Sequence, residues 1–182
     1  MSYQLITART EWPVELDEVK VHLRESGTSN DAYIQELIYS ATDKAENEND
    51  LALNEMTFDL LLDDFPSSIR LWKHPVSSVT SVKYTDTDGN TQTVTSSNYS
   101  TDLFEYPARI YPVAGYTWPG VKDTANAVQV RFVTGFASPT VLPGDIKQAI
   151  YLIIADFMDN REDKGRRFAR MSERILRNCK YR

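Results

Sequence analysis

The residues of this chain with the most definite chemistry are arginines that recur at short intervals near its C-terminal end. They are Arg166, Arg167, Arg170, Arg174 and Arg177. A guanidinium group is always charged and presents a planar fork of donors, so it binds carboxylates and phosphates in a bidentate manner. These arginines are therefore the candidate contact residues, and their ligand is either an acidic protein surface or the phosphates of DNA.

The charge of the chain is divided unevenly along its length. The formal net charge is −6, from 20 basic and 26 acidic side chains. The segment 161–182 holds nine basic and three acidic side chains, a net +6, which leaves −12 on the rest of the chain. An acidic body with a basic end predicts a partner for that end, either nucleic acid or an acidic surface on another copy of the chain.

A helix predicted over about 166–178 would position these arginines. At about 100° per residue its apolar side chains gather on one side and the arginines on the other. The apolar side chains are Phe168, Met171, Ile175 and Cys179. The preceding REDKG segment, 161–165, predicts a hinge. The arginine face is then a solvated basic surface or a contact with DNA or an acidic neighbour.

Other patterns that carry chemistry are missing from the sequence. His22 and His74 stand alone and are interpreted as structural, and no Cys/His cluster has the spacing of a metal site. The acidic runs 46–50 and 63–64 lack the ligand spacing and the glycine of a Ca²⁺ loop, so they are interpreted as solvated acid. No phosphate loop and no nucleophile motif is present. We therefore predict no catalytic residue, metal or cofactor, and we expect that the protein is not an enzyme.

The aromatic side chains of the segment RIYPVAGYTWPG form a second candidate. Tyr111, Tyr116 and Trp118 could stack on bases, but packing of this loop onto a sheet is the favoured interpretation.

Composition points to a folded protein made and used in a cytoplasm. The chain has 182 residues, 41% of them hydrophobic, which suits one domain or one domain with a large insertion. The single Cys179 can form no internal disulfide and fits a reducing compartment. No apolar run approaches the roughly 20 residues of a membrane span, and the N-terminus lacks the features of a signal peptide. We therefore expect no membrane partner.

The predicted elements place helices at both ends of the chain and strands between them. Helices are predicted over about 16–24, from 30 or 31 to about 47–50, and over 143–160. The last of these has the longest apolar stripe of the chain, and residues 3–13 are predicted to be an irregular or extended arm. The apolar stripe consists of Ile146, Ile150, Ile153, Ile154 and Phe157.

The middle of the chain has the short Val-, Thr- and Tyr-rich runs typical of antiparallel strands. Asp88-Gly89 predicts a hairpin turn, and the strand 126–134 alternates Val128, Val130 and Phe132 with polar residues. Strands are predicted over 52–62, 68–72, 76–85, 91–95, 98–102, 108–112 and 126–134.

The sequence thus predicts an α+β fold. A small helical core, with two N-terminal and two C-terminal helices, carries an inserted antiparallel β-rich subdomain. The expected division is 1–50 for the N-terminal helical part, 51–139 for the β-rich insertion, and 140–182 for the C-terminal helices with the basic tail helix.

Taken in order, the segments of the chain resemble a known family. The chain reads LDEVKVHLR and NDAYIQELIYSA, then IRLWKHPVSSVTSVKYTDTDGN, YPARIYPVAGYTWPG, NAVQVRFVTGF and LPGDIKQAIYLIIADFMDNRE. This succession, over residues 14–162, resembles the tailed-phage head–tail connector (adaptor) family, whose members are often labelled possible DNA-packaging proteins. The order and spacing carry the resemblance, since no single segment would suffice.

The resemblance implies a structural role in the virion, at the head–tail connector region. Family members assemble as a ring, typically dodecameric, under the portal protein, join it to the next neck or tail-completion protein, and leave a channel for double-stranded DNA. The family has no known catalytic residues to carry over. The segment after Arg161 lies outside the matched part, so the role of the arginines rests on charge alone. The alternative is a DNA-binding packaging or regulatory factor that uses the arginine-rich helix.

Overall fold

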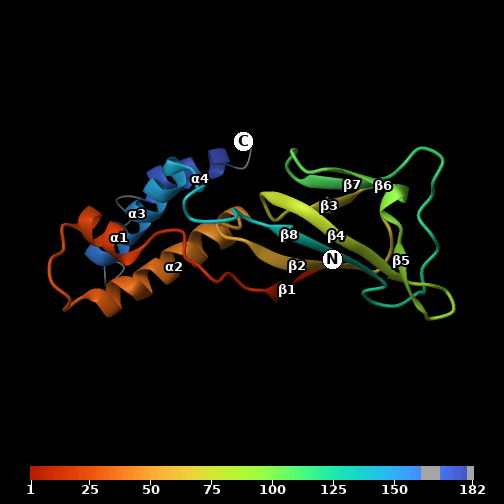
Figure 1. Ribbon diagram of the computed structural model, residues 1–182, viewed down its shortest axis with the longest axis horizontal. Coiled ribbons are helices and arrows are strands. Elements are labelled where there is room, and N and C mark those ends of the chain that lie inside the picture. The colour runs from red at the N-terminus through yellow and green to blue at the C-terminus, as the bar shows by residue number, and fades with distance from the viewer. Residues whose placement is uncertain (161–168, 180–182) are drawn as a thin grey trace. The chain divides into compact units, whose positions relative to one another are not determined.

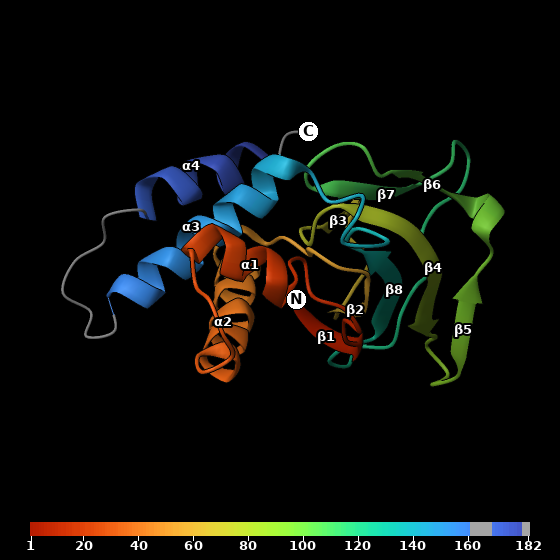
Figure 2. The same ribbon diagram turned by 60° about the vertical axis from the view of Figure 1, so that its left-hand side comes forward.

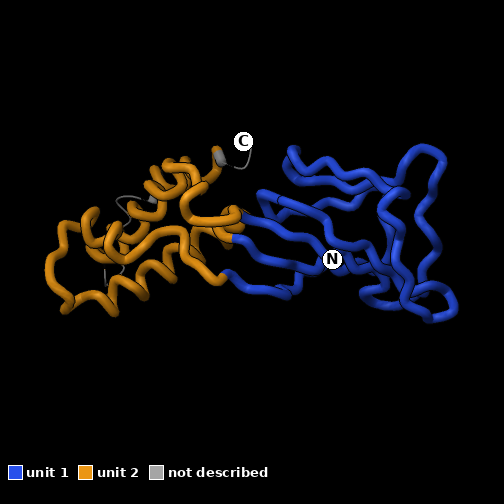
Figure 3. The backbone as a smooth tube through the Cα atoms, in the orientation of Figure 1, with its two compact units in different colours: residues 1–9, 55–135 blue, residues 10–54, 136–182 orange. Residues whose placement is uncertain are grey.

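The computed structural model describes residues 1–160 and 169–179 and has the α+β fold that the sequence predicts. The chain divides into two compact units, which Figure 3 shows in different colours. The β unit comprises residues 1–9 and 55–135, and the helical unit comprises residues 10–54 and 136–182. Each unit is described by itself below.

The helical unit contains the four helices described in the chain. They are α1 (Leu16–Leu23), α2 (Asp31–Asn49), α3 (Gly144–Asp159) and α4 (Ala169–Cys179). The first three agree closely with the predicted ranges, because their ends carry strong local signals. The hinge predicted over 161–165 and the predicted helix start at Arg166 lie outside the described residues.

Local hydrogen bonds explain where α1 begins and ends. The backbone N–H of Glu15 donates to the Glu18 carboxylate at 3.2 Å, within a reciprocal capping box that satisfies amides of the first turn. Arg24 has a φ of 57°, in the left-handed region, so the helix cannot continue past it. The chain then turns through the segment 25–30 into α2.

The acidic run 46–50 ends α2, and its interpretation as solvated acid is wrong for Glu46. Glu46 is 5% exposed, and its carboxylate accepts a 2.8 Å hydrogen bond from the backbone N–H of Leu53. Asn49 is also buried, and its side chain donates to the carbonyl of Ala45. Both polar groups are buried because they satisfy the backbone where the chain leaves the helix.

The apolar face of α3 forms the centre of the core of the helical unit. Ile146, Ile150, Ile153 and Ile154 are buried as the spacing predicts, and Phe157 is partly buried. This face packs in one cluster with apolar side chains of the other three helices, and α4 lies alongside α3 in Figure 2. The partners are Val19 of α1, Ile34, Leu37, Ile38, Ala41 and Ala45 of α2, and Leu176 of α4.

The β unit contains two antiparallel sheets (Figure 1). A five-stranded sheet has the order β1-β2-β8-β4-β5, and a three-stranded sheet has the order β3-β7-β6. The strands are β1 (Ser2–Thr7), β2 (Met56–Leu62), β3 (Ile69–Leu71), β4 (Val76–Thr85), β5 (Thr91–Val94), β6 (Tyr99–Asp102), β7 (Ala108–Pro112) and β8 (Val128–Thr134). The seven strands from β2 onward fall within or on the predicted ranges.

The N-terminal arm, predicted to be irregular or extended, is extended over its first part. Residues 2–7 form the edge strand β1, which pairs antiparallel with β2, with Tyr3 opposite Leu60. The structure therefore places residues 1–9 in the β unit, although the expected division assigned 1–50 to helices. The side chains of β1 are mostly exposed, so no alternation of apolar residues marks the strand in the sequence.

The β4–β5 hairpin forms at the predicted turn. The Asp86 carboxylate accepts the backbone N–H groups of Asp88 at 3.1 Å and Asn90 at 2.8 Å. Gly89 has a φ of 91°, a conformation that glycine adopts without steric cost. These contacts set the register in which Val82 lies opposite Val94.

An ion pair with a buried carboxylate links β2 to β8, the central strand of the five-stranded sheet. Asp59 on β2 is 0% exposed and lies opposite Arg131 on β8, which donates to both of its carboxylate oxygens at 2.8 Å. The Gln129 side chain adds a third donor at 2.6 Å. Hydrogen bonding to Arg131, which outweighs the effect of burial, holds the pKa of Asp59 below its ordinary value.

We predict that Asp59→Asn lowers the free energy of unfolding by about 2 kcal/mol at neutral pH, because it removes the charge from a buried group that receives three hydrogen bonds. The folded-state pKa of Asp59 is lower than its unfolded value, so this stability is complete above the unfolded pKa and is lost as pH falls through the folded pKa. Urea unfolding between pH 7 and pH 3 measures both effects. Asp123→Asn, an exposed site in the same unit, is the control, and equal stability of the two variants would contradict the prediction.

Candidate interaction surfaces

The candidate arginines lie on the outer side of α4 where the structure describes them. Arg174 and Arg177 are exposed, whereas Ser172 and Leu176 are each 2% exposed and face the core. At 100° per residue the two arginines lie opposite this buried side, so both guanidinium groups are available to a partner. Arg170 belongs to α4 by its backbone, but its side chain is not described. Arg166 and Arg167 lie outside the described residues.

The buried side of α4 is rotated from its predicted position. Met171, predicted to lie on the apolar face, is 54% exposed, and Leu176 instead enters the core cluster with Ile175 partly buried beside it. The small side chain of Ser172 allows the helix to approach its neighbour closely at that point. Phe168 and the side chain of Cys179 fall outside the description. Arg174 and Arg177 therefore lie away from the buried side of α4, as predicted. The residues that pack α4 against the core differ from the predicted ones.

An excess of carboxylates covers the first two helices of the same unit. Residues 10–54 contain eleven acidic and three Lys or Arg side chains. Some of the carboxylates are paired: Lys147 bridges to Glu18 at 3.2 Å, and Lys20 bridges to Asp31 at 2.6 Å. The exposed carboxylates are Glu11, Glu15, Asp17, Glu18, Glu36, Asp43 and Glu48. This surface is therefore complementary in charge to the arginine face of α4.

A cavity of about 570 Å³ opens in this acidic part of the helical unit. Trp12 lines it and stacks on Tyr39 with ring centroids 4.1 Å apart. The carboxylates of Glu11 and Glu15 also lie at its lining. An aromatic face beside two carboxylates suits a guanidinium group, which can stack on the ring and form hydrogen bonds to the carboxylates.

Glu18 connects α1 to α3 through a small polar cluster. Burial raises its pKa, but the backbone N–H of Glu15 and the Lys147 ammonium outweigh this effect and hold the pKa below its ordinary value. Tyr151 donates to Glu18 at 3.3 Å, and burial together with this carboxylate raises the pKa of Tyr151 to about 12. His22 stacks on the Tyr151 ring at 5.1 Å and so packs against this cluster.

The aromatic side chains of the β unit fall into two groups. Tyr116 and Trp118 pack within the β unit: Trp118 stacks on Phe65, in the segment after β2, at 4.8 Å, and Tyr116 contacts Trp118 edge-on at 6.4 Å. Tyr111 differs and is 43% exposed. Phe104, which the sequence analysis did not single out, is 98% exposed. It lies in the loop between β6 and β7, where no helical or strand periodicity marks an exposed apolar residue in the sequence.

The described residues contain no group of three or more His, Cys, Asp or Glu side chains placed to hold a metal ion. Among these residues, no helix has the length and apolar character needed to cross a membrane.

Solved structures resemble this chain over nearly its whole length, although no protein-family model and no curated protein matches it. A chain in the neck of an empty gene transfer agent (GTA) particle, computed with C6 symmetry, is 25% identical with a TM-score of 0.79, and the match covers 96% of this chain and 95% of that one. A chain of the virion of the native GTA particle is 22% identical with a TM-score of 0.80, covering 98% and 94%. A chain in the neck of the native particle, computed with C12 symmetry, is 24% identical with a TM-score of 0.77, covering 96% and 94%. The fold is therefore shared with a component of a phage-like neck, in line with the resemblance to head–tail connectors.

We predict that the two sides of α4 respond differently to substitution. Leu176→Ala should lower the free energy of unfolding by about 2–4 kcal/mol, because it leaves a cavity in the core. The double variant Arg174→Gln, Arg177→Gln should change it by less than about 0.5 kcal/mol, because both side chains are exposed. Thermal unfolding of the two variants beside the unchanged protein measures this difference. Similar losses in both would show that the arginines stabilise the fold itself.

Proposed function

We propose that this chain is a structural head–tail connector protein in the neck of a phage-like virion. The observation that carries the proposal is the full-length likeness to chains from GTA necks, in which neither unit is left unmatched. The ordered sequence segments over 14–162 support it independently, because they come from both units. Such a protein works through its shape and interfaces and not through turnover, so it needs no catalytic centre.

The proposed assembly is a homo-oligomeric ring, dodecameric in the simplest case, seated on the portal protein. Two of the similar chains come from necks computed with C6 and C12 symmetry, which supports copies repeated around an axis. A ring requires a heterologous interface, in which one surface of a copy binds a different surface of the next. The ring would join the portal to the next neck or tail-completion protein and leave a channel through which double-stranded DNA passes.

The charges of the helical unit suggest how the interfaces form. Arg174 and Arg177 point away from their own core, while the carboxylates of α1 and α2 outnumber their cationic partners. The basic tail helix of one copy can therefore bind an acidic surface on a neighbouring copy or on the portal. Carboxylates that face a channel would instead repel the phosphates of passing DNA and limit adhesion.

A second candidate function is a DNA-binding packaging or regulatory factor, and the exposed arginine face favours it. Arginines that neutralise phosphates release counterions, so the affinity would fall steeply as salt rises. The strong negative charge of the rest of the chain opposes this function, because it repels a nucleic acid that approaches the same unit.

We predict that replacing Arg166, Arg170, Arg174 and Arg177 together by Gln weakens ring assembly or portal docking about tenfold or more, because several exposed ion pairs are lost at once. Native mass spectrometry and cosedimentation with portal particles measure the effect. The matched control replaces the same number of charges in the β unit: Arg70, Lys73, Lys83 and Lys122. Unchanged assembly and docking of the first variant would exclude the arginine face as an interface.

We also predict that the purified protein shows weak or no specific binding to free DNA in a gel-shift assay at moderate salt. Tight binding with a steep salt dependence, abolished by the same four substitutions, would favour the DNA-binding function instead. Loss of DNA binding in the β-unit control as well would assign that binding to general charge and not to the tail helix.

A further inference from the structure

Phe104 is the most exposed large apolar side chain of the described chain, at 98%. Its loop, residues 103–107, joins β6 to β7 and is held at both sides. Arg109 pairs with Glu105 inside the loop and with Asp102 at 3.4 Å before it. Tyr106 contacts the Trp72 ring edge-on at 6.0 Å. The loop is thus clamped to its sheet while the phenyl ring points into solvent, and such an ordered, exposed aromatic is typical of a side chain that a partner covers.

A second feature of the β unit is an open aromatic cavity of about 450 Å³. The stacked rings of Phe65 and Trp118 line it, and Tyr116, Thr117 and two prolines complete much of the lining. The prolines are Pro112 and Pro119. The cavity lies within the size range of sites that take apolar ligands, and its wall is formed mainly of rings.

One residue that lines this cavity has an unpaired polar atom. The indole Nε1 of Trp118 is buried and has no hydrogen-bond acceptor among the described residues. A buried indole N–H usually finds an acceptor, and leaving it unpaired costs free energy. This atom is covered within the single copy, so the cavity offers an inserted side chain its aromatic walls and not this donor.

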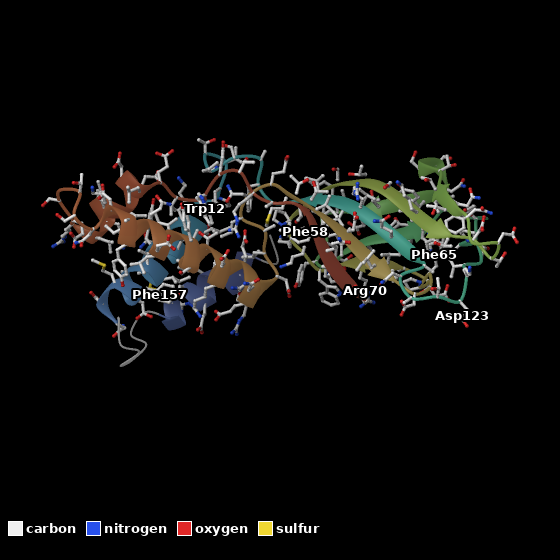
Figure 4. The ribbon with its side chains drawn as sticks, turned by 90° about the horizontal axis from the view of Figure 1, so that it is seen from below. Trp12, Phe58, Phe65, Arg70, Asp123 and Phe157 are labelled. Atoms are coloured by element: carbon white, nitrogen blue, oxygen red, sulfur yellow. The ribbon has the colours of Figure 1, made fainter. Side chains whose placement is uncertain are left out.

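The exposed phenylalanine and the cavity lie at opposite ends of the three-stranded sheet. In the β6–β7 pair, Asp102 lies opposite Arg109 next to the Phe104 loop, whereas Tyr99 lies opposite Pro112 at the cavity end. The five residues of β7 separate the two ends by roughly 17 Å. Figure 1 shows the β6–β7 loop and the segment after β7 at different ends of this sheet. Figure 4 shows that Phe65, which lines the cavity, lies toward the same end of the unit as Asp123. A copy therefore cannot place its own Phe104 in its own cavity.

We propose that Phe104 of one copy inserts into the Phe65–Trp118 cavity of the next copy, as part of the ring interface. The inference rests on the proposed ring, because it needs identical copies repeated around an axis. Different surfaces of the same unit meet in this contact, so it is heterologous, the type that closes into a ring when the rotation between copies allows it. A second copy is the favoured occupant because each chain presents its most exposed aromatic side chain at one end of the three-stranded sheet and an aromatic cavity at the other end. In this contact the cavity of the neighbouring copy would bury most of the phenyl group.

Mixed cysteine crosslinking tests this contact directly. Two proteins are prepared, one with Phe104→Cys and one with Thr117→Cys, each in a Cys179→Ser background. They are mixed and treated with a short bismaleimide, once without portal particles and once with them. The contact predicts a crosslinked pair in the mixture and none in either protein alone, because the two positions belong to different surfaces. Absence of the mixed pair in both conditions overturns the proposal, and so does a crosslink to portal instead of the second copy.

Substitutions of Phe104 and at the Phe65–Trp118 cavity test how much this contact contributes to the association of copies. Phe104→Ser should weaken association of copies about 30-fold, the loss expected for truncation of a buried aromatic anchor. Thr117→Arg, in the lining of the cavity, should weaken the association of copies to a similar extent, because the longer side chain fills the cavity. Val21→Ser, which removes an 80% exposed apolar side chain from the helical unit, is the matched control and should leave association unchanged. All three sites are exposed, so the melting temperature of each monomer should not change.

The outcomes separate this contact from the proposed function. If the Phe104→Ser variant forms rings on the portal with the same mass and the same affinity as the unsubstituted protein, the Phe104 contact is wrong. The connector function would remain in place. Failure of the unsubstituted protein to bind portal or to form any oligomer would instead remove the basis of both.

Discussion

The burial of the apolar face of α3 is the interaction on which the helical unit depends. Its isoleucines are among the most deeply buried side chains of the chain, and helices from both ends of the sequence pack on them. Removing this much aliphatic surface from water supplies most of the driving force that holds the N-terminal hairpin to the C-terminal segment. It also sets the orientation of α4, because Leu176 must join the same cluster. Once Leu176 points inward, Arg174 and Arg177 must point outward, so the core determines which charges a partner meets.

The same unit separates its charges by position. Its N-terminal helices are acidic, and its last helix is basic on the side away from the core. The internal ion pairs, such as the part-buried Lys20 with Asp31, use only some of the carboxylates. In the proposed assembly the remaining charges would act between copies, where complementary surfaces speed encounter and select the correct neighbour.

The β unit contributes rigidity and a different kind of surface. Its sheets are antiparallel, and the Asp59–Arg131 pair joins β2 to the central strand β8 in the observed register. On this frame the loops at the two ends of the three-stranded sheet hold aromatic side chains in set positions. Phe104 is displayed without a covering neighbour, while Phe65 and Trp118 form a recess. Protein interfaces commonly depend on a few aromatic anchors, so these small loops would determine the geometry of the proposed contact between copies.

Much of the fold follows from local patterns that the sequence alone determines. The 3.6-residue spacing of isoleucines determined α3, the Asp88-Gly89 turn determined the β4–β5 hairpin, and the alternation of β8 determined its buried side, because each signal is complete within a few residues. The division of charge between body and tail was likewise readable from composition. Tertiary structure alone decided what depends on distant partners. The strand β1 forms because it can pair with the edge of β2. Glu46 is buried because its carboxylate accepts the backbone N–H of Leu53. Leu176 and not Met171 enters the core because only one side of α4 packs against it. The recess beneath Trp118 required the packing of a loop from the end of β2 against one that follows β7, and no pattern within either segment contains that contact.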